Sequence, residues 1–397
     1  MRFDPATRRL SQNPRDPAFF ADPYAAYARL HAAPVFWEDY GFWCFGGHAA
    51  VSALLRDKRF GRQILHVATR AELGWPERPQ HLADFDAIER HSLLELEPPE
   101  HTRLRGLVNR AFVSRQVERL APAIAEMAER LIDKLAPGDD LIAGFATPLP
   151  VGVIAALIGA PAGDAALLLD WSHKMVAMYQ FAPTRADEDA AAAAARDFAA
   201  YVRALVAERR REPRDDLVSQ LIAAESGEGR LSEDELVTTV ILLLNAGHEA
   251  TVHALGNAVK ALLEQGARFD GSEAAVEELL RFDPPLHMFT RYALQEVEIE
   301  GVHLRKGERV GLLLGAANRD PAVFADPARL DLARARNPHV AFGAGIHFCV
   351  GAPLARREMR VALAALFRRL PGLGLAEPPC YRDAYHFHGL TALRVTW

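Results

Sequence analysis

A single run of about 33 residues between Ser232 and Gly266 constrains the fold more than any other feature, because ordinary globular helices are shorter. Ser232 and Glu235 form a capping box at its start, and Gly266 provides a stop signal. The pattern therefore predicts one helix over 232–265, about 50 Å long at 1.5 Å per residue. Residues 240–244 are apolar all round and the run lacks coiled-coil heptads, so we expect its middle to be buried.

Polar side chains follow this apolar stretch within the same predicted helix. They are Asn245, His248, Glu249, Thr251 and His253. Burying such groups without partners is costly, so they must bond to one another, to water or to a ligand.

A second segment carries one cysteine, Cys349, between a glycine-rich turn and the start of a helix. The glycines allow a tight loop under a flat ligand, and Pro353 suits the first turn of a helix. A sulfur at a helix N-terminus is close to exposed amides and to the positive end of the helix dipole, which favour a thiolate. A thiolate that donates electron density to iron is what O–O cleavage at haem requires.

Other interpretations of this loop explain less of it. A dinucleotide fingerprint over 343–348 needs a third glycine where Phe348 stands, and covalent haem attachment needs a Cys-x-x-Cys-His motif that is absent. A buried structural cysteine is the commonest alternative for a lone cysteine. It is the expectation for Cys44 and Cys380, which have no comparable context.

The run 342–351, FGAGIHFCVG, resembles the cysteine-ligand loop of the cytochrome P-450 family, F-G-x-G-x-H-x-C-x-G, at every fixed position. The resemblance implies that Cys349 ligates the iron of haem b. It places four further residues of the loop at the haem: Phe342, Gly343, His347 and Gly351.

The segment 246–251, AGHEAT, resembles the distal-helix motif of the same family, [A/G]-G-x-[D/E]-T-[T/S]. The resemblance implies that Ala246 and Gly247 leave room for dioxygen above the iron. It also implies that Glu249 and a following alcohol relay protons.

This chain departs from the distal motif at Ala250, where the family has a threonine after the acid. Thr251 follows one position later, about 100° around the helix. From the resemblance we therefore expect Glu249 to act as the catalytic acid, with Thr251, a bound water or a substrate hydroxyl in place of the alcohol missing at Ala250.

Two more segments extend the resemblance to residues 97–358. Glu278 and Arg281 match the family's E-x-x-R and share a helix face. An exposed salt bridge is the default for such a pair, whereas the resemblance implies a buried network that supports the haem loop.

Residues 97–105, EPPEHTRLR, resemble the family's D-P-P-E-H-x-x-x-R, with Glu97 replacing aspartate. Cationic donors suit the two propionates of haem, although a solvated basic helix start would look similar. The resemblance assigns the propionates to His101, Arg105, Arg291 and His347.

The substrate is not identified by the sequence. The residues expected to line its site are Leu242, Asn245, Ala246, His287 and Phe289, and Ala250 shares the helix face of the first three. A variable lid is expected from the loop 62–95 and from 171–190. A mostly apolar pocket with a few polar groups fits steroids, terpenoids, aromatics and fatty acyl chains alike.

Secondary-structure patterns indicate mostly helices with small pieces of sheet. Hairpin strands are expected at 35–37 and 42–45, short strands within 297–314, and another hairpin in the last 25 residues. Further helices are predicted over 47–57, 101–135, 150–178, 186–212 and 215–224.

Bulk properties agree with an intracellular enzyme. The 397 residues carry a net charge of −6, so nothing in the overall charge recruits nucleic acid or anionic lipid. Three cysteines fit a reducing compartment. Residues 1–40 contain no signal peptide or membrane anchor, so we expect a cytoplasmic monomer with one domain over 1–397.

These observations predict a mainly α protein with the cytochrome P-450 fold. The haem would lie between the 232–265 helix and the Cys349 loop, with a small β region beside the large helical domain. The implied activity is a monooxygenase that inserts one oxygen atom of dioxygen into a small hydrophobic substrate.

Electrons would come from separate proteins, by family analogy a ferredoxin and a ferredoxin reductase. A basic patch for an acidic carrier is expected from Arg103, Arg110, Arg356, Arg357 and Arg360. A solvated helix face explains these arginines about as well.

Two rival functions remain open at this point. A cysteine hydrolase would use Cys349 as its nucleophile, and colourless protein would favour it. A haem-binding sensor would show a haem spectrum but consume no reductant with any substrate. Peroxide-driven hydroxylation or decarboxylation is a variant of the leading function.

Overall fold

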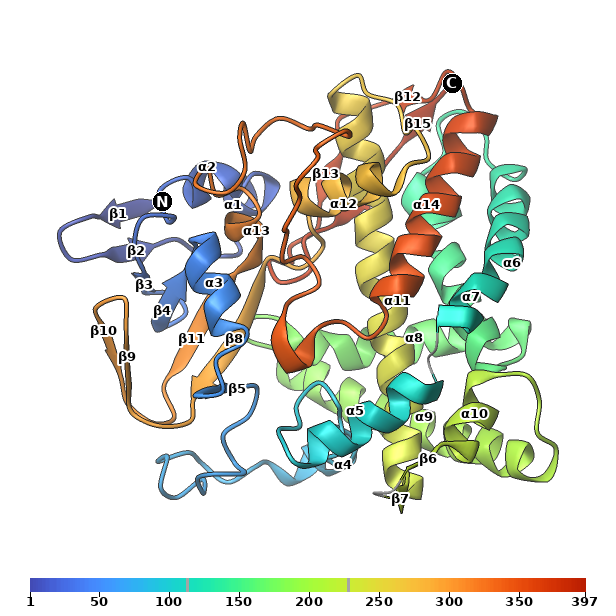
Figure 1. Ribbon diagram of the computed structural model, residues 1–397. Coiled ribbons are helices and arrows are strands. Elements are labelled where there is room, and N and C mark those ends of the chain that lie inside the picture. Colours follow the sequence, from blue (N-terminus) through green and yellow to red (C-terminus); the bar gives the residue numbers. More distant parts are fainter. Residues whose placement is uncertain (112–113, 227–228) are drawn as a thin grey trace.

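The computed structural model describes residues 1–111, 114–226 and 229–397, and it is mainly helical with a smaller β region (Figure 1). The predicted fold class is confirmed. The longest helix among these residues, α11, spans Glu233–Glu264, and Ser232 and Glu235 form the predicted capping box. Its middle is buried, as residues 240–244 led us to expect, and Leu242 is the one residue of that stretch that is partly exposed.

Helices from both halves of the chain pack around α11, so it lies at the centre of the main hydrophobic core. They are α4 (Ala83–Glu89), α7 (Pro148–Ile158), α8 (Ala165–Val176), α9 (Arg185–Arg211), α10 (Leu217–Ala223), α12 (Glu273–Phe282) and α14 (Ala352–Arg369). The other helices are α1 (Pro17–Ala21), α2 (Tyr24–Tyr27), α3 (His48–Leu54), α5 (Glu100–Ala111), α6 (Ser114–Ile132) and α13 (Leu314–Ala317).

Three predicted stretches differ from the structure. The stretch 101–135 contains α5 and α6, and residues 112 and 113 between them lie outside the described residues. The stretch 150–178 is two helices, because Gly159 ends α7 in the left-handed region at φ 78°. The expected loop 62–95 contains helix α4.

A seven-stranded sheet lies to one side of the helical body (Figure 1). Its strands are ordered β1 (Arg2–Asp4), β2 (Arg9–Ser11), β3 (Val35–Trp37), β4 (Phe42–Phe45), β11 (Arg309–Leu313), β8 (Met288–Ala293) and β5 (Phe60–Gly61). The predicted hairpin is confirmed, since β3 and β4 pair antiparallel with Val35 opposite Cys44. The expected strands within 297–314 are β9 (Val297–Ile299), β10 (Val302–Leu304) and β11.

The C-terminal segment is not the single hairpin that we predicted. β12 (Gly374–Leu375) pairs with β15 (Val395–Thr396), and inside them β13 (Cys380–Tyr381) pairs with β14 (Leu390–Ala392). Two prolines at positions 378 and 379 interrupt the ladder because they have no N–H to donate. A further pair, β6 (Glu225–Ser226) and β7 (Gly229–Arg230), precedes α11.

Candidate active site

The cysteine loop is held by its own backbone. The N–H of Cys349 donates to the carbonyl of Phe342 at 3.1 Å, just before α14 begins. Gly345 has a φ of 72°, and a Cβ there would collide with the carbonyl oxygen of Leu55 on the C-terminal side of α3. A glycine is therefore required at this turn, as the loop motif predicts.

The electrostatics of Cys349 differ from the sequence argument. Burial raises the pKa of its thiol, and this outweighs the N–H groups of Gly351 and Ala352 and the guanidinium groups of Arg105 and Arg356. The helix terminus alone does not make the sulfur a thiolate. A coordinated metal ion does, because it deprotonates the thiol that binds it.

The pair Glu278–Arg281 on α12 is completely buried, with both side chains 0% exposed. Two guanidinium nitrogens of Arg281 donate to the Glu278 carboxylate at 2.8 Å each. Arg281 also donates to the carbonyls of Asn318 and Pro327, both at 2.9 Å. The predicted buried network is thus present, and it ties α12 to the chain that leads into the cysteine loop.

Glu278 accepts three further hydrogen bonds from that chain. The donors are the N–H of Asp331 at 2.8 Å, Arg334 Nε at 3.0 Å and Asn337 Nδ2 at 3.1 Å. The network therefore fixes residues 331–337 a few positions before Phe342. Its role is to position the cysteine loop rather than to react.

The expected propionate donors contain two imidazoles that lie together. The rings of His101 on α5 and His347 in the cysteine loop have centroids 4.5 Å apart. His347 Nε2 is 3.3 Å from Glu97 Oε1, whereas neither ring nitrogen of buried His101 has a hydrogen-bond partner among the described residues. Burial, with the nearby His347, lowers the pKa of His101 to about 4.

The two arginines of the set are also short of partners. Arg291 on β8 is 3% exposed, and its guanidinium donates a hydrogen bond to the Thr290 carbonyl at 2.9 Å. It makes no ion pair among the described residues, and burial lowers its pKa to about 9. Arg105 donates to the Phe348 carbonyl at 2.7 Å and to Asn109. These under-partnered donors fit a ligand with two carboxylates, as haem has.

One face of α11 is open in the middle of the helix. Ala246 is exposed in the middle of the helix, and Leu242 and Ala250, four residues to either side, are partly exposed. Phe289 on β8 and Phe348 in the cysteine loop are also incompletely buried. Small and apolar side chains are therefore accessible on α11, on β8 and in the loop, which fits contact with the flat apolar body of haem.

Gly247 has a different environment from Ala246. A Cβ on Gly247 would lie 3.1 Å from Cδ1 of Ile154, so this glycine allows α7 to pack closely against α11. It lies on another side of the helix from the open face at Ala246.

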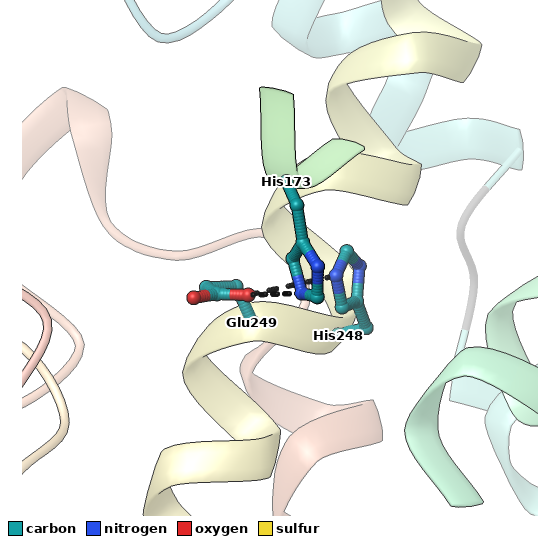
Figure 2. Close-up of side chains that lie close together, drawn as sticks. All are labelled: His173, His248 and Glu249. Atoms are coloured by element: carbon teal, nitrogen blue, oxygen red, sulfur yellow. Dashed lines mark ion pairs between the residues drawn. The ribbon is translucent and has the colours of Figure 1, made fainter. Parts of the chain in front are cut away.

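Glu249 lies in a cluster of ionisable side chains (Figure 2). His173 Nε2 of α8 is 3.4 Å from Glu249 Oε2, and His253 Nε2 is 3.2 Å from Oε1. Arg382 also donates to Oε1 at 2.9 Å. Burial raises the pKa of Glu249, but these partners outweigh it and hold the pKa well below its usual range.

The neighbouring polar residues of α11 are less completely bonded. The Thr251 hydroxyl donates to the Gly247 carbonyl at 3.2 Å, one turn back along the helix. Asn245 Nδ2 is 3.7 Å from Met175 Sδ, and its Oδ1 has no partner among the described residues. His248 Nδ1 lies 2.8 Å from the Leu244 carbonyl, and its Nε2 is 3.7 Å from Glu249 Oε2 without a hydrogen bond among the described residues.

We predicted that His287 and Phe289 both line the substrate site, but the structure places the two side chains in different environments. His287 is 0% exposed, and its Nδ1 is 2.8 Å from the Tyr27 hydroxyl. Phe289 is only partly buried. Sequence reasoning also missed His173 and Arg382 as partners of Glu249, because neither belongs to a local motif.

None of the helices within the described ranges is both long and apolar enough to cross a bilayer.

Comparisons with known proteins agree with this geometry. A family model described as Cytochrome P450 matches residues 272–371. Nocardicin C N-oxygenase of Nocardia uniformis subsp. tsuyamanensis is 42% identical over 371 residues, which cover 89% of each chain. The biotin biosynthesis cytochrome P450 of Bacillus subtilis is 35% identical and covers 96% of this chain and 97% of its own.

A solved structure extends the likeness to three dimensions. The crystal structure of P450BioI in complex with an acyl carrier protein ligated to hexadec-9Z-enoic acid has a TM-score of 0.87 and 33% identity. The match covers 96% of this chain and 100% of that one. The chain therefore belongs to the cytochrome P450 family of haem-thiolate monooxygenases.

Proposed function

We propose that Cys349 provides the axial thiolate to the haem iron. The observation that carries this proposal is the set of under-partnered cationic and imidazole groups beside the cysteine loop. His101, Arg105, Arg291 and His347 would hold the propionates, and Phe342, Gly343 and Gly351 would lie against the ring. When bound, the haem supplies the iron at which dioxygen is activated.

The open face of α11 would form the oxygen-binding side of the site. Ala246 has only a methyl group there, so it leaves room for a small molecule. Leu242 and Phe289 would pack against an apolar substrate and keep bulk water away. Asn245 Oδ1, which has no partner among the described residues, is available to accept one hydrogen bond from it.

Glu249 would carry protons from solvent toward this side. Its carboxylate is ionised and bonded to His173, whose side chain is 49% exposed. A proton can therefore reach the buried carboxylate through an imidazole that touches water. His253 and Arg382 hold the carboxylate in place.

The group that follows Glu249 in the relay would be Thr251, a water or a substrate hydroxyl. Ala250 supplies no hydroxyl where the family has one. The Thr251 hydroxyl uses its proton on the Gly247 carbonyl, which leaves its oxygen free to accept a hydrogen bond from a water. A water that donates a hydrogen bond to Thr251 would then be the next group to receive the proton from Glu249.

Electrons would come from a ferredoxin-type carrier and its reductase. Three arginines of the expected docking patch already form internal ion pairs: Arg103 with Glu235, Arg356 with Glu277 and Arg360 with Glu273. The positive field available to an acidic carrier is therefore smaller than the number of arginines suggests. The same proposal places the enzyme in the cytoplasm, where its free cysteines stay reduced.

The substrate would be a small hydrophobic molecule admitted under a lid. The two expected lid segments touch each other: the Tyr179 hydroxyl donates to Glu89 at 2.8 Å, and His81 Nε2 is 2.7 Å from Glu188. The lining set is Leu242, Asn245, Ala246 and Phe289. We leave His287 out of it because that side chain is fully buried elsewhere.

The test is the spectrum of the reduced protein with carbon monoxide. Thiolate-ligated haem gives a strongly red-shifted Soret band, which Cys349→Ser should abolish. Cys380→Ser is the matched control, because Cys380 is exposed and should leave the band unchanged. A red-shifted band that persists in Cys349→Ser would refute the assignment.

A further inference from the structure

A second group of side chains that could hold a metal ion lies around Asp283. Asp283, His287 and His388 are all buried, and one potential ligand atom from each lies within 4.8 Å of the others. His388 Nε2 is 3.4 Å and His287 Nε2 is 3.7 Å from the same oxygen, Asp283 Oδ1. Both imidazole nitrogens thus face the same carboxylate oxygen.

Three separate segments bring these residues together. Asp283 follows the last residue of α12, His287 precedes β8, and His388 lies just before β14. The backbone N–H of His388 donates to the Pro285 carbonyl at 2.8 Å. Asn257 of α11 donates to the carbonyls of His388 and Asp283 at 2.9 and 3.4 Å, so the arrangement is anchored on the central helix.

Each imidazole has a nitrogen that faces the carboxylate without a hydrogen bond. Neither His287 Nε2 nor His388 Nε2 has a hydrogen-bond partner among the described residues, although these side chains are 0% and 1% exposed. Two imidazoles therefore face a buried carboxylate that makes no ion pair with Lys or Arg in the described ranges.

Groups around the cluster orient it as metal ligands are usually oriented. His287 Nδ1 is 2.8 Å from the Tyr27 hydroxyl, which in turn is 2.7 Å from the Tyr385 hydroxyl. A proton on Nδ1 donated to Tyr27 leaves the Nε2 lone pair free for a metal. The Tyr381 hydroxyl donates to the other carboxylate oxygen, Asp283 Oδ2, at 3.1 Å.

The cluster at Glu249 contrasts with this one (Figure 2). There His173, His248 and Glu249 also gather, but Arg382 already neutralises the carboxylate at 2.9 Å and His173 is half exposed. Arg382 therefore balances the charge of the Glu249 carboxylate, whereas Asp283 makes no ion pair with Lys or Arg in the part of the chain that the structure describes.

We propose that Asp283, His287 and His388 bind one structural Zn²⁺ ion. Zinc bonds of about 2.0–2.1 Å in a tetrahedron separate neighbouring ligand atoms by about 3.4 Å, close to the spacing found here. Water or the Tyr24 hydroxyl, 2.7 Å from Asp283 Oδ1, would take the fourth position. The ion would tie the C-terminal segment to α12 and β8, and its binding does not depend on the haem assignment.

The test is the zinc content of tag-free haem enzyme, loaded with Zn²⁺ and then dialysed against metal-free buffer. Elemental analysis should give about one zinc per iron, the content of a single structural site. His388→Gln and His287→Gln should each lose at least tenfold. His173→Gln, which alters the other cluster, should keep its zinc.

A second measurement on the wild-type enzyme tests the proposal even if the variants do not fold. Stripping zinc from the wild-type enzyme with a chelator should lower its melting temperature, and Zn²⁺ but not Mg²⁺ should restore it. Zinc below a tenth of the iron in the loaded wild type would overturn the proposal. Loss of zinc in His173→Gln would also overturn the proposal. Retention of zinc in both His287→Gln and His388→Gln would do the same, because the zinc would then be bound at another site.

Discussion

Two buried carboxylates, Glu278 beneath the cysteine loop and Glu249 on the central helix, are both surrounded by donors but differ in access to water. Glu278 and its partner Arg281 are both 0% exposed. Glu249 is 5% exposed, yet its partners His173 and Arg382 are 49% and 35% exposed. The first network is sealed and the second is connected to solvent.

The difference in solvent access indicates that the Glu278 network supports the fold, whereas Glu249 can take part in proton transfer. All the acceptor sites of the Glu278 carboxylate are occupied by donors, so the network holds a single geometry and can fix the backbone that carries Cys349. A carboxylate whose partners reach water can exchange protons while remaining in place. The two buried glutamates therefore have different roles. Substitutions in the Glu278 network should change stability, and substitutions at Glu249 should change turnover.

The largest effect is expected from breaking the sealed network. Arg281→Ala leaves the Glu278 carboxylate buried without its principal counter-charge, which costs about 3–5 kcal/mol. We expect a large drop in the urea midpoint and poor haem incorporation.

The matched control for this change is Arg360→Ala. Its ion pair with Glu273 has side chains 40% and 83% exposed, so it should cost no more than about 1 kcal/mol. Equal urea midpoints for the two variants would show that the Glu278 network does not support the fold.

The next effect concerns turnover rather than stability. Glu249→Gln keeps the shape of the side chain but removes the proton-carrying carboxylate, and a positioned acid–base group contributes about a hundredfold or more. We expect turnover to fall by about that factor while the urea midpoint changes little. Thr251→Ala should instead divert reductant into hydrogen peroxide at nearly unchanged consumption.

The readout is the stoichiometry of reductant, peroxide and product. Ala250→Thr is the complementary variant, since it restores the family's hydroxyl and should raise the product yield or clash with substrate. Unchanged product yield in Glu249→Gln together with Thr251→Ala would place the relay elsewhere.

A smaller effect is expected from the propionate donors. Removing one charge-assisted partner costs about 1.5–3 kcal/mol, so Arg291→Ala should release haem faster to a haem acceptor. Arg105→Ala should act in the same direction. Arg56→Ala is a suitable control, because that guanidinium bonds to Ser52 on the surface. Identical haem-transfer rates for all three variants would exclude the clamp.

Features encoded by local patterns could be predicted from the sequence. The capping box, the glycine turn at Gly345 and the i, i+3 spacing of Glu278 and Arg281 each involve residues a few positions apart. Their structures follow from backbone geometry, so the central helix, the cysteine loop and the buried pair were all expected.

Features that depend on distant segments could not be predicted this way. His173 and Arg382 reach Glu249 from α8 and the C-terminal segment, and no local motif marks them. The position of His287 could not be predicted either. We assigned it to the substrate site because it is close to Phe289 in the sequence. Backbone pairing between the segments around 286 and 387 turns that histidine toward His388 instead. The interrupted C-terminal hairpin has the same origin, since its pairing partners are set by long-range packing.

A third carboxylate, Glu89 in the lid, differs from both. It belongs to no sealed network and makes no ion pair with a cation among the described residues. It accepts a hydrogen bond from Tyr179 at 2.8 Å. Burial, together with the negative charge of Glu95, raises the pKa of Glu89 to about 8.

The folded protein therefore holds a proton on Glu89 that the unfolded chain releases near its ordinary pKa of about 4.3. Stability contributed by this proton is full below that pH and is lost as pH rises toward 8, by at most about 1.4 kcal/mol per pH unit and less for a partly exposed group. Glu89→Gln should flatten the fall in melting temperature between pH 5 and 8, whereas exposed Glu377→Gln should not. Parallel melting curves for Glu89→Gln and wild type across this range would mean that Glu89 is ionised like Glu249, and that solvent reaches the lid as well as the relay.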